Sequence, residues 1–332
     1  MSEHFLAWWN VENLFDTESS PNRTDKLKRA LAKELKGWTN SILEKKIAQL
    51  SKIILRLNNN RGPDILGVCE VENKPVVVKL ANSLASLHDR SYKVIHADTS
   101  DERGIDVALI YDSKRLEIER DQDNNELVFS HFILKRVATR DILQVNFKTV
   151  PNGNRLVVIG NHWPSRRGGQ YESEPYRIVA GETLSYFHQR ILEKNKDEDG
   201  KTAIIIMGDF NDEPHNRSIT EYALATTSIL KVRLSKEAPR LYNLMWPTMA
   251  QGSGTFYYEN FPNFLDQFMI SRGIALEGKI SVTDDAVQII TFPEMMMGKY
   301  KVPVKFGRPS DKSLNVNGFS DHFPISVTIK EN

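Results

Sequence analysis

The apolar run over residues 202 to 207, with the four residues after it, constrains the fold more than any other part of the sequence. The run is short, rich in β-branched side chains and ended by Gly208, which predicts an interior strand. Asp209 and Asn211 follow at once, and alternation puts their side chains on one side of the chain. Oxygen groups there suit a hydrated divalent cation or an attacking water, because Mg²⁺ and Mn²⁺ prefer oxygen ligands. An ordinary Asx-type turn fits the same residues, so other segments must decide.

Four other apolar segments also have polar side chains at one end. They cover residues 5–9, 64–69, 156–160 and 323–329, and the polar residues beside them are Asn10, Glu70, Asn161, His162, Asp321 and His322. Each of these residues alone is more often structural than catalytic. Together they match an α/β scaffold that gathers distant side chains at one edge of its sheets. We therefore predict a single site built from strand ends.

Short motifs spread over nearly the whole chain resemble the endonuclease/exonuclease/phosphatase superfamily, typified by pancreatic DNase I and the abasic-site endonucleases. In chain order they are Trp9-Asn10-Val11-Glu12-Asn13-Leu14-Phe15, Val68-Cys69-Glu70-Val71-Glu72, Arg103-Gly104-Ile105-Asp106-Val107-Ala108, Asn161-His162-Trp163-Pro164, Gly208-Asp209-Phe210-Asn211, Leu265-Asp266-Gln267-Phe268 and Ser320-Asp321-His322-Phe323-Pro324. The resemblance implies an α/β fold, a DNase I-like sandwich of two packed mixed β-sheets flanked by helices. It also implies one domain over residues 1–332, because the polar strand ends extend from Asn10 to His322 and any cut would divide the site.

Hydrophobic periodicity agrees with such a fold. Apolar spacing predicts helices over residues 25–58, with a break at 37–39, and over 75–87 and 174–193. Further strands are expected near residues 92–97, 106–111, 115–120, 127–135 and 140–148. Several of these strands are close enough to form hairpins, which predicts mixed and antiparallel sheets.

Composition excludes some classes of protein. The chain has 332 residues and a single cysteine, so no intramolecular disulfide forms and we expect Cys69 in the core. The first strand begins by Phe5, which leaves no room for a secretory signal, and we expect a cytoplasmic protein. No apolar run approaches the ~20 residues that span a bilayer, so stable membrane insertion is not expected. Coiled-coil heptads are missing, and we expect a monomer.

The residues predict a metal site that holds Mg²⁺ or Mn²⁺. Glu70 is the best ligand because a carboxylate binds a hard cation strongly. Asn10 completes the shell directly or through water, and Asp321 adds to it.

The resemblance implies the catalytic roles. It pairs Asp266 with His322, so that the carboxylate orients the ring and raises its pKa. Asp209 orients or deprotonates the attacking water, and sequence does not decide whether Asp209 or His322 takes the proton. Asn211 stabilises a phosphoryl oxygen, and His162 binds a non-bridging oxygen.

Other polar residues are candidates for binding the substrate. Asn161 either holds the phosphate or braces its loop, and Asp106 is a candidate partner for His162. Arg166 and Arg167 follow His162 between a serine and two glycines, and we predict that they contact phosphate. Arg103 is a further candidate, although it also fits a turn before a strand.

The substrate is the least determined part of the prediction. The net charge of +1 gives no global attraction to polyanions, and we find no basic helix and no obvious lipid-binding hairpin. A metal-dependent phosphodiesterase acting on DNA or RNA is our first hypothesis. The alternatives are a phosphomonoesterase, a phosphodiesterase of small molecules or lipid headgroups, and a non-catalytic phosphate-binding module. Residues 292–306, with three consecutive methionines, form either a mobile contact surface or a loop folded over a sheet edge with one or two methionines buried.

Overall fold

Two mixed sheets form the body of the protein, whose computed structural model describes residues 2–134, 139–195 and 201–332. The first sheet has the order β15 (Ile280–Ile289), β18 (Ile325–Glu331), β1 (Glu3–Leu14), β2 (Ile65–Val71), β4 (Asp106–Asp112) and β3 (Tyr92–His96). The second has the order β10 (Ala225–Thr226), β11 (Leu241–Asn243), β14 (Asp266–Ile270), β9 (Ala203–Asp209), β8 (Arg155–His162), β7 (Ile142–Thr149) and β5 (Leu116–Ile118), with β6 (Val128–His131) also paired to β7. The predicted α/β fold of two mixed sheets is confirmed.

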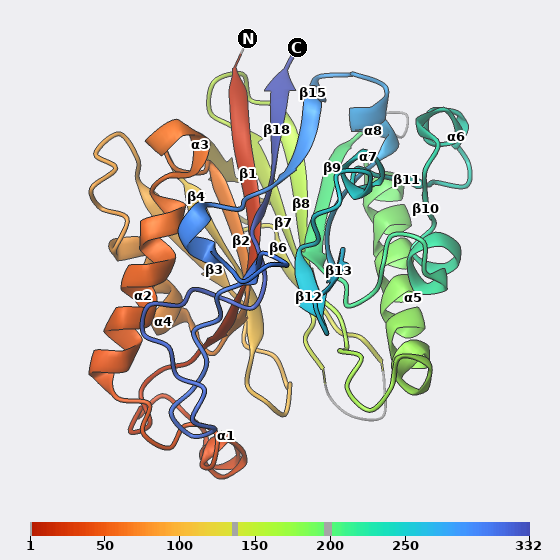
Figure 1. Ribbon diagram of the computed structural model, residues 1–332. Helices are drawn as coiled ribbons and strands as arrows, with labels where there is room; N and C mark the ends of the chain where they lie inside the picture. Colours follow the sequence, from red (N-terminus) through yellow and green to blue (C-terminus); the bar gives the residue numbers. More distant parts are fainter. Residues whose placement is uncertain (1, 135–138, 196–200) are drawn as a thin grey trace.

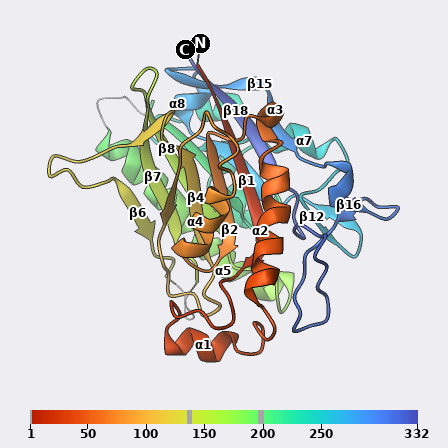
Figure 2. The ribbon, with the colours of Figure 1, turned by 90° about the vertical axis from the view of Figure 1, so that its left-hand side faces the viewer.

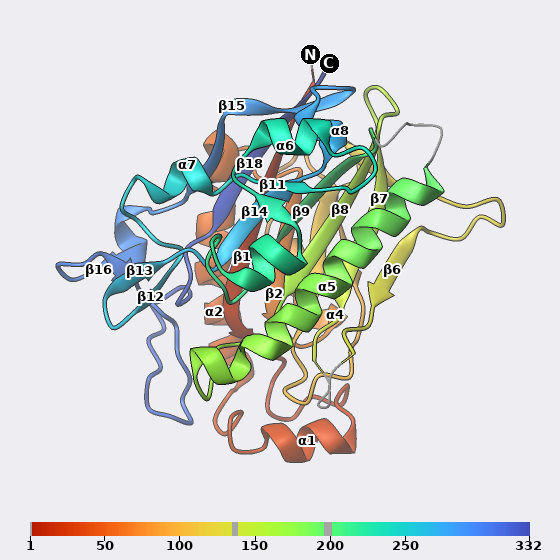
Figure 3. The ribbon, with the colours of Figure 1, turned by 90° about the vertical axis from the view of Figure 1, so that its right-hand side faces the viewer.

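Helices cover the outer face of each sheet. Figure 1 shows α2 (Asn40–Ile54) and α4 (Lys74–Asn82) on one side and α5 (Gln170–Lys194) on the other, and Figures 2 and 3 view these two faces. The remaining elements are short: α1 (Asp25–Leu31), α3 (Leu57–Asn60), a π-helical turn (Ser218–Tyr222), α6 (Ile229–Leu234), α7 (Trp246–Met249), α8 (Arg272–Ala275), a 3₁₀ turn (Pro293–Met295), and the strand pairs β12 (Phe256–Tyr258) with β13 (Phe261–Asn263) and β16 (Met296–Met297) with β17 (Val302–Pro303).

Strict alternation along the strands creates three apolar layers. On β1, Trp8 points between the sheets, whereas Trp9 packs toward α2 and α4. On β9, Met207 points between the sheets, whereas Ile206 packs toward α5. Each strand is therefore buried on both faces, which explains why these segments read as nearly continuous apolar runs.

Strand direction brings the polar ends together. β1 is parallel to β2, and β8 is parallel to β9, so these four strands end at the same edge of their sheets. β18 is antiparallel to β1, and β14 is antiparallel to β9, so their first residues lie at that edge as well. In Figure 1 this is the lower end of the molecule, opposite the two termini. Residues far apart in the sequence thus meet at one end of the two sheets.

The predicted elements are found with shifted ends. The helix expected over residues 25–58 is divided into α1, α2 and α3, because the chain turns between Leu31 and Asn40, where Gly37 has a φ of 83°. The predicted strand over 127–135 is β6, and residue 135 lies outside the described residues. The methionine segment folds over a sheet edge, with Met295 buried and Met297 exposed, which is the second of its two predicted forms. Cys69 is fully buried, as expected.

Within the described ranges, no helix is both long enough and apolar enough to cross a membrane.

Gly67 allows the two sheets to approach each other, and its replacement tests this packing. A Cβ at Gly67 would lie 2.5 Å from the Trp8 ring and 2.8 Å from the Met207 methyl group. We expect Gly67→Ala to lower the free energy of unfolding by about 1–3 kcal/mol, because close-packed cores resist added atoms. Urea unfolding measures this change. Gly278→Ala is the control, since its Cβ would meet only a backbone oxygen at 3.3 Å. Equal losses in the two variants would contradict close packing at Gly67.

Candidate active site

A hydrogen bond between the two sheets marks the centre of the site. Asn10, which lies in β1 just before its pairing with β2 is interrupted by a bulge, donates from Nδ2 to Oδ2 of Asp209, at the end of β9, over 3.0 Å. The other Asp209 oxygen accepts from the backbone N–H of Asn211 at 2.9 Å. Asp209 therefore forms the Asx-type turn with one oxygen and faces the site with the other, so both interpretations of this segment hold.

His322 and Asp266 form the predicted pair. Nδ1 of His322 lies 2.6 Å from Oδ2 of Asp266, and Oδ1 of Asp266 accepts from the Trp8 indole at 3.0 Å. Burial alone would lower the pKa of His322, but the carboxylates of Asp266, Asp209 and Asp321 outweigh it and raise that pKa well above its usual range. The ring is therefore an imidazolium at neutral pH.

Asp209 lies between two histidines. Its Oδ2 is 3.8 Å from Nε2 of His162 and 4.0 Å from Nε2 of His322. Burial raises the pKa of Asp209 to about 6, and the positive charge of His322 limits this rise. At pH 7 the carboxylate is ionised, yet it is basic enough to accept a proton from a bound water.

His162 is the neutral histidine of the site. Burial lowers its pKa well below the usual range, and the charges of Arg140 and Arg103 lower it further. Its Nδ1 is buried without a hydrogen-bond partner. Asp106, the suggested partner, instead accepts from the Thr99 hydroxyl at 2.6 Å and lies 3.3 Å from His96, so that suggestion is wrong.

Glu70 and Asp321 are the two carboxylates predicted to hold a metal. Oε2 of Glu70 accepts from the Asn13 N–H at 3.0 Å, and Oε1 faces His162 at 3.9 Å. Burial raises the pKa of Asp321, and the negative charge of Glu70 raises it further. Two carboxylates that repel each other suit a hard divalent cation, and the Asn10 oxygen retains a free lone pair beside its bond to the Glu12 N–H.

Asp209 also belongs to two groups of side chains whose possible metal-binding atoms lie within 4.8 Å of one another. One group contains Cys69 and His162, and the other contains Asp266 and His322. Neither group suits a metal as well as the oxygen set. Burial raises the pKa of the Cys69 thiol well above its usual range, so it stays protonated. Neighbouring carboxylates raise the pKa of His322 as well, so a metal at either group would have to displace a proton.

A buried ion pair under the site was missed by the sequence analysis. Nζ of Lys46 lies 3.8 Å from Oε2 of Glu12 and donates to the Phe319 carbonyl at 2.7 Å. Burial raises the pKa of Glu12 to about 7, against the opposing charge of Lys46, and Asp321 raises it further. Lys46 lies three residues after Leu43 and four before Leu50, on the apolar stripe of α2. That spacing could have indicated a buried lysine.

Two residues predicted to bind substrate are placed differently by the structure. Asn161 is fully buried on the α5 side of β8, where it accepts from the Trp163 indole at 3.1 Å, because alternation turns it away from the face that carries His162. Arg166 donates to the Asn211 carbonyl at 2.8 Å, and its remaining nitrogens donate to Asn263, Asp212 and Asn216. Asn161 thus braces its loop, the second of its two predicted roles. Arg166 is held by internal bonds and partly exposed, and its contact with phosphate stays a prediction.

Arg103 and Arg167 remain near the site. Arg103 donates to the Asn13 side chain at 3.2 Å and is close enough to His162 to lower its pKa. Arg167 is exposed, and no hydrogen bond or ion pair holds its guanidinium in the part of the chain that the structure describes. These two arginines can therefore still meet an anion.

Four non-glycine residues around the site have left-handed backbone. Glu12, Asn13, Glu70 and Asn211 have φ values of 51°, 56°, 62° and 51°. At Glu70 the register between β1, β2 and β4 also shifts, so the bulge re-aims the carboxylate out of the strand alternation. Such conformations cost of order 1–3 kcal/mol each, and they are typical of functional sites.

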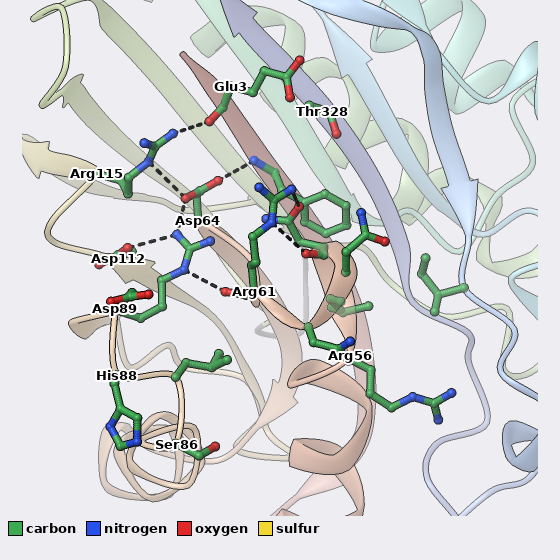
Figure 4. Close-up of a pocket in the computed structure, with 18 of the residues that line it drawn as sticks. Glu3, Arg56, Arg61, Asp64, Ser86, His88, Asp89, Asp112, Arg115 and Thr328 are labelled. Carbon is green, nitrogen blue, oxygen red and sulfur yellow. Dashed lines mark hydrogen bonds and ion pairs between the residues drawn. The ribbon is translucent and has the colours of Figure 1, made fainter.

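A cavity of about 910 Å³ lies at the other end of the first sheet, near Glu3. Figure 4 shows Arg115 directed at Asp64, with which it pairs. Arg90 pairs with both Asp64 and Asp112. Arg56, on its rim, pairs with Glu294. These arginines are neutralised within the protein, and the cavity takes no part in the site at Asp209.

Comparison with known proteins agrees with this fold. The model of the Endonuclease/Exonuclease/phosphatase family matches residues 5–331. Similar solved structures include the Bacteroides thetaiotaomicron mannosyl-6-phosphatase, at 14% identity and a TM-score of 0.56 over 98% of this chain and 99% of that one. Truncated Caenorhabditis elegans TDP2 is 12% identical, with a TM-score of 0.55 over 98% and 97%. The human Nocturnin catalytic domain is 14% identical, with a TM-score of 0.50 over 99% and 95%. None of the curated protein sequences compared with the chain matches it.

The Asp266–His322 pair is directly testable by titration. We expect Asp266→Asn to lower the pKa of His322, because it removes the negative charge that lies 2.6 Å from Nδ1. NMR of the histidine ring signals over pH 5 to 9 measures this, and the ring of the variant loses its proton at a lower pH than in the unmodified protein. Asp98→Asn, at a side chain that is 85% exposed beside His96, is the control. An unchanged His322 titration in Asp266→Asn would contradict the assigned pair.

Proposed function

Because the chain belongs to the endonuclease/exonuclease/phosphatase family, as the match over residues 5–331 shows, we propose that it is a divalent-metal-dependent phosphoric ester hydrolase that cleaves phosphodiesters of nucleic acid. Members of this family hydrolyse phosphate esters. The observation that carries the proposal is the position of Asp209, an ionised carboxylate of raised pKa between a neutral and a protonated histidine. Hydrolysis of an ester needs a base for water and positive charge at the phosphate, and these three groups supply both.

Glu70, with Asn10 and Asp321, would hold the divalent cation, which when bound supplies positive charge to the phosphate oxygens. Asp209 accepts the proton of the attacking water. The Asn10 amide, which donates to Asp209 at 3.0 Å, keeps that carboxylate aimed into the site. Since burial raises the pKa of Asp209 to about 6, it gains strength as a base without losing its charge at pH 7.

The two histidines have different tasks. Neighbouring carboxylates raise the pKa of His322, which favours its protonated form; the ring stabilises the developing negative charge and donates its Nε2 proton to the leaving oxygen. Asp266 holds that ring by its bond to Nδ1. His162 is neutral, and its ring donates a hydrogen bond to a non-bridging oxygen. Of the two candidates that the sequence left open, we therefore propose Asp209 as the base.

Nucleic acid is the proposed substrate because Arg103 and Arg167 remain able to contact phosphates beside the site. A phosphomonoesterase is the second candidate. It is favoured by the internal bonds of Arg166, which compete with one expected contact to a polyanion, and by the similarity to a mannosyl-6-phosphatase.

Hydrolysis assays separate these candidates. Supercoiled plasmid, abasic duplex, single-stranded RNA, a bis-aryl phosphodiester and a sugar phosphate are each incubated with Mg²⁺, Mn²⁺ or EDTA. We expect metal-dependent cleavage that falls by roughly a hundredfold or more in Asp209→Asn, because the base is lost. Asp98→Asn, an exposed carboxylate, is the matched control.

Cleavage of the sugar phosphate alone would support the second candidate. Equal rates in Asp209→Asn and the unmodified protein would contradict the assigned base. Binding of metal and phosphate without turnover of any substrate would support the remaining hypothesis, that the protein is a non-catalytic phosphate-binding module.

A further inference from the structure

A short hairpin stands beside the catalytic histidine. β12 and β13 pair from Phe256 with Asn263 to Tyr258 with Phe261, and only Glu259 and Asn260 join them. These two residues have φ values of 48° and 69°, the left-handed conformation of a type I′ turn, which fits the twist of a tight hairpin. The turn therefore fixes which side chains share a face. Sequence patterns did not predict this hairpin.

One face of the hairpin is joined to the site at its base. The Phe256 ring lies 4.8 Å from the His322 ring, and the two residues form an antiparallel bridge. Opposite Phe256 on the same face, the Asn263 oxygen accepts from Arg166 at 3.2 Å. On the other face, Tyr257 packs edge-on against Phe323. The base of the hairpin is thus anchored on both faces.

The outer end of the same face carries two exposed aromatic rings. Tyr258 and Phe261 are 64% and 72% exposed, and they lie directly opposite each other. Side chains two residues apart on a strand share a face and are separated by about 7 Å, so both rings lie one step beyond Phe256, away from His322. Figures 1 and 3 show the hairpin at the end of the sheets where the catalytic strands meet.

We infer that Tyr258 and Phe261 stack an unpaired nucleobase of the substrate next to the phosphate that is cleaved. The inference rests on the proposed function and names its substrate class, a nucleic acid that is single-stranded at the cleavage point. Every base has a flat π-face that stacks on aromatic rings, whereas in a duplex both faces are covered by neighbouring bases. The anchored hairpin holds its rings in place before binding, so little conformational entropy is lost.

Positive charge near the site suits the phosphates on either side of that base. Arg103 and Arg167, close to the site, are available for the flanking phosphates. The combination of exposed aromatic rings and nearby cations is typical of binding to single strands.

Binding assays test the inference. Fluorescence anisotropy measures the affinity of a labelled twelve-nucleotide DNA strand, and of the same strand with abasic sites at its centre, in the Asp209→Asn background with Mg²⁺ present. We expect the unmodified rings to bind the abasic strand about tenfold or more weakly than the normal strand. We expect the same loss of affinity for the normal strand in the double variant Tyr258→Ala, Phe261→Ala, and no further loss when that variant meets the abasic strand. Tyr258→Phe with Phe261→Trp is expected to restore affinity, since both rings are kept. Tyr186→Ala, a 53% exposed ring on α5, is the control and leaves affinity unchanged.

Three outcomes would overturn the inference. The first is an unchanged affinity in the double variant, provided that it keeps the melting temperature of the parent. The second is equal affinity of the parent for normal and abasic strands. The third is binding to vesicles of phosphatidylcholine and phosphatidylserine that the double variant loses, which would assign the rings to a membrane. If no phosphate ester is hydrolysed in the assays above, the proposed function fails instead.

Discussion

An excess of buried negative charge at the junction of the two sheets is the constraint on which the site depends. Five carboxylates gather there, from Glu12, Glu70, Asp209, Asp266 and Asp321. Burial raises the pKa values of Glu12, Asp209 and Asp321, and the positive charges of Lys46 and the His322 ring oppose that rise. Desolvated like charges raise one another's pKa, as at Asp209 and Asp321, unless a cation is added. A divalent metal is the simplest such cation, and the same imbalance that destabilises the unliganded site favours its binding.

The fold creates this junction through strand direction and alternation. The ends of β1, β2, β8 and β9 and the starts of β14 and β18 lie at one edge, and alternation selects which of their residues face inward. His162 and Asp209 share the inner face with the inter-sheet core, whereas Asn161 is turned outward to the α5 side. Left-handed backbone at Glu70 then redirects a carboxylate that alternation alone would misplace. At Asn211, which also has left-handed backbone, the side-chain amide donates to the Trp163 carbonyl at 3.0 Å.

Much of this could be predicted from the sequence because its signals are local. Apolar runs that end in polar residues located most of the strands and the residues of the site, and the motif order indicated the fold. Errors and omissions arose where contacts between distant segments decide which partner a side chain has. The bonds of Arg166 to Asn263 and Asn216, the pairing of Asp106 with His96, and the Glu12–Lys46 pair depend on tertiary packing. Asn161 is different, since the period of two along β8 already contained the answer.

The location of a bound metal tests the central claim most directly, namely that the excess carboxylates form a hard-cation site. Crystals grown with Mn²⁺ would be measured near the manganese absorption edge. The account predicts an anomalous peak among Glu70, Asn10 and Asp321 that is lost in Glu70→Gln. A peak between Cys69 and His162, or no peak at a Mn²⁺ concentration that supports turnover, would contradict it.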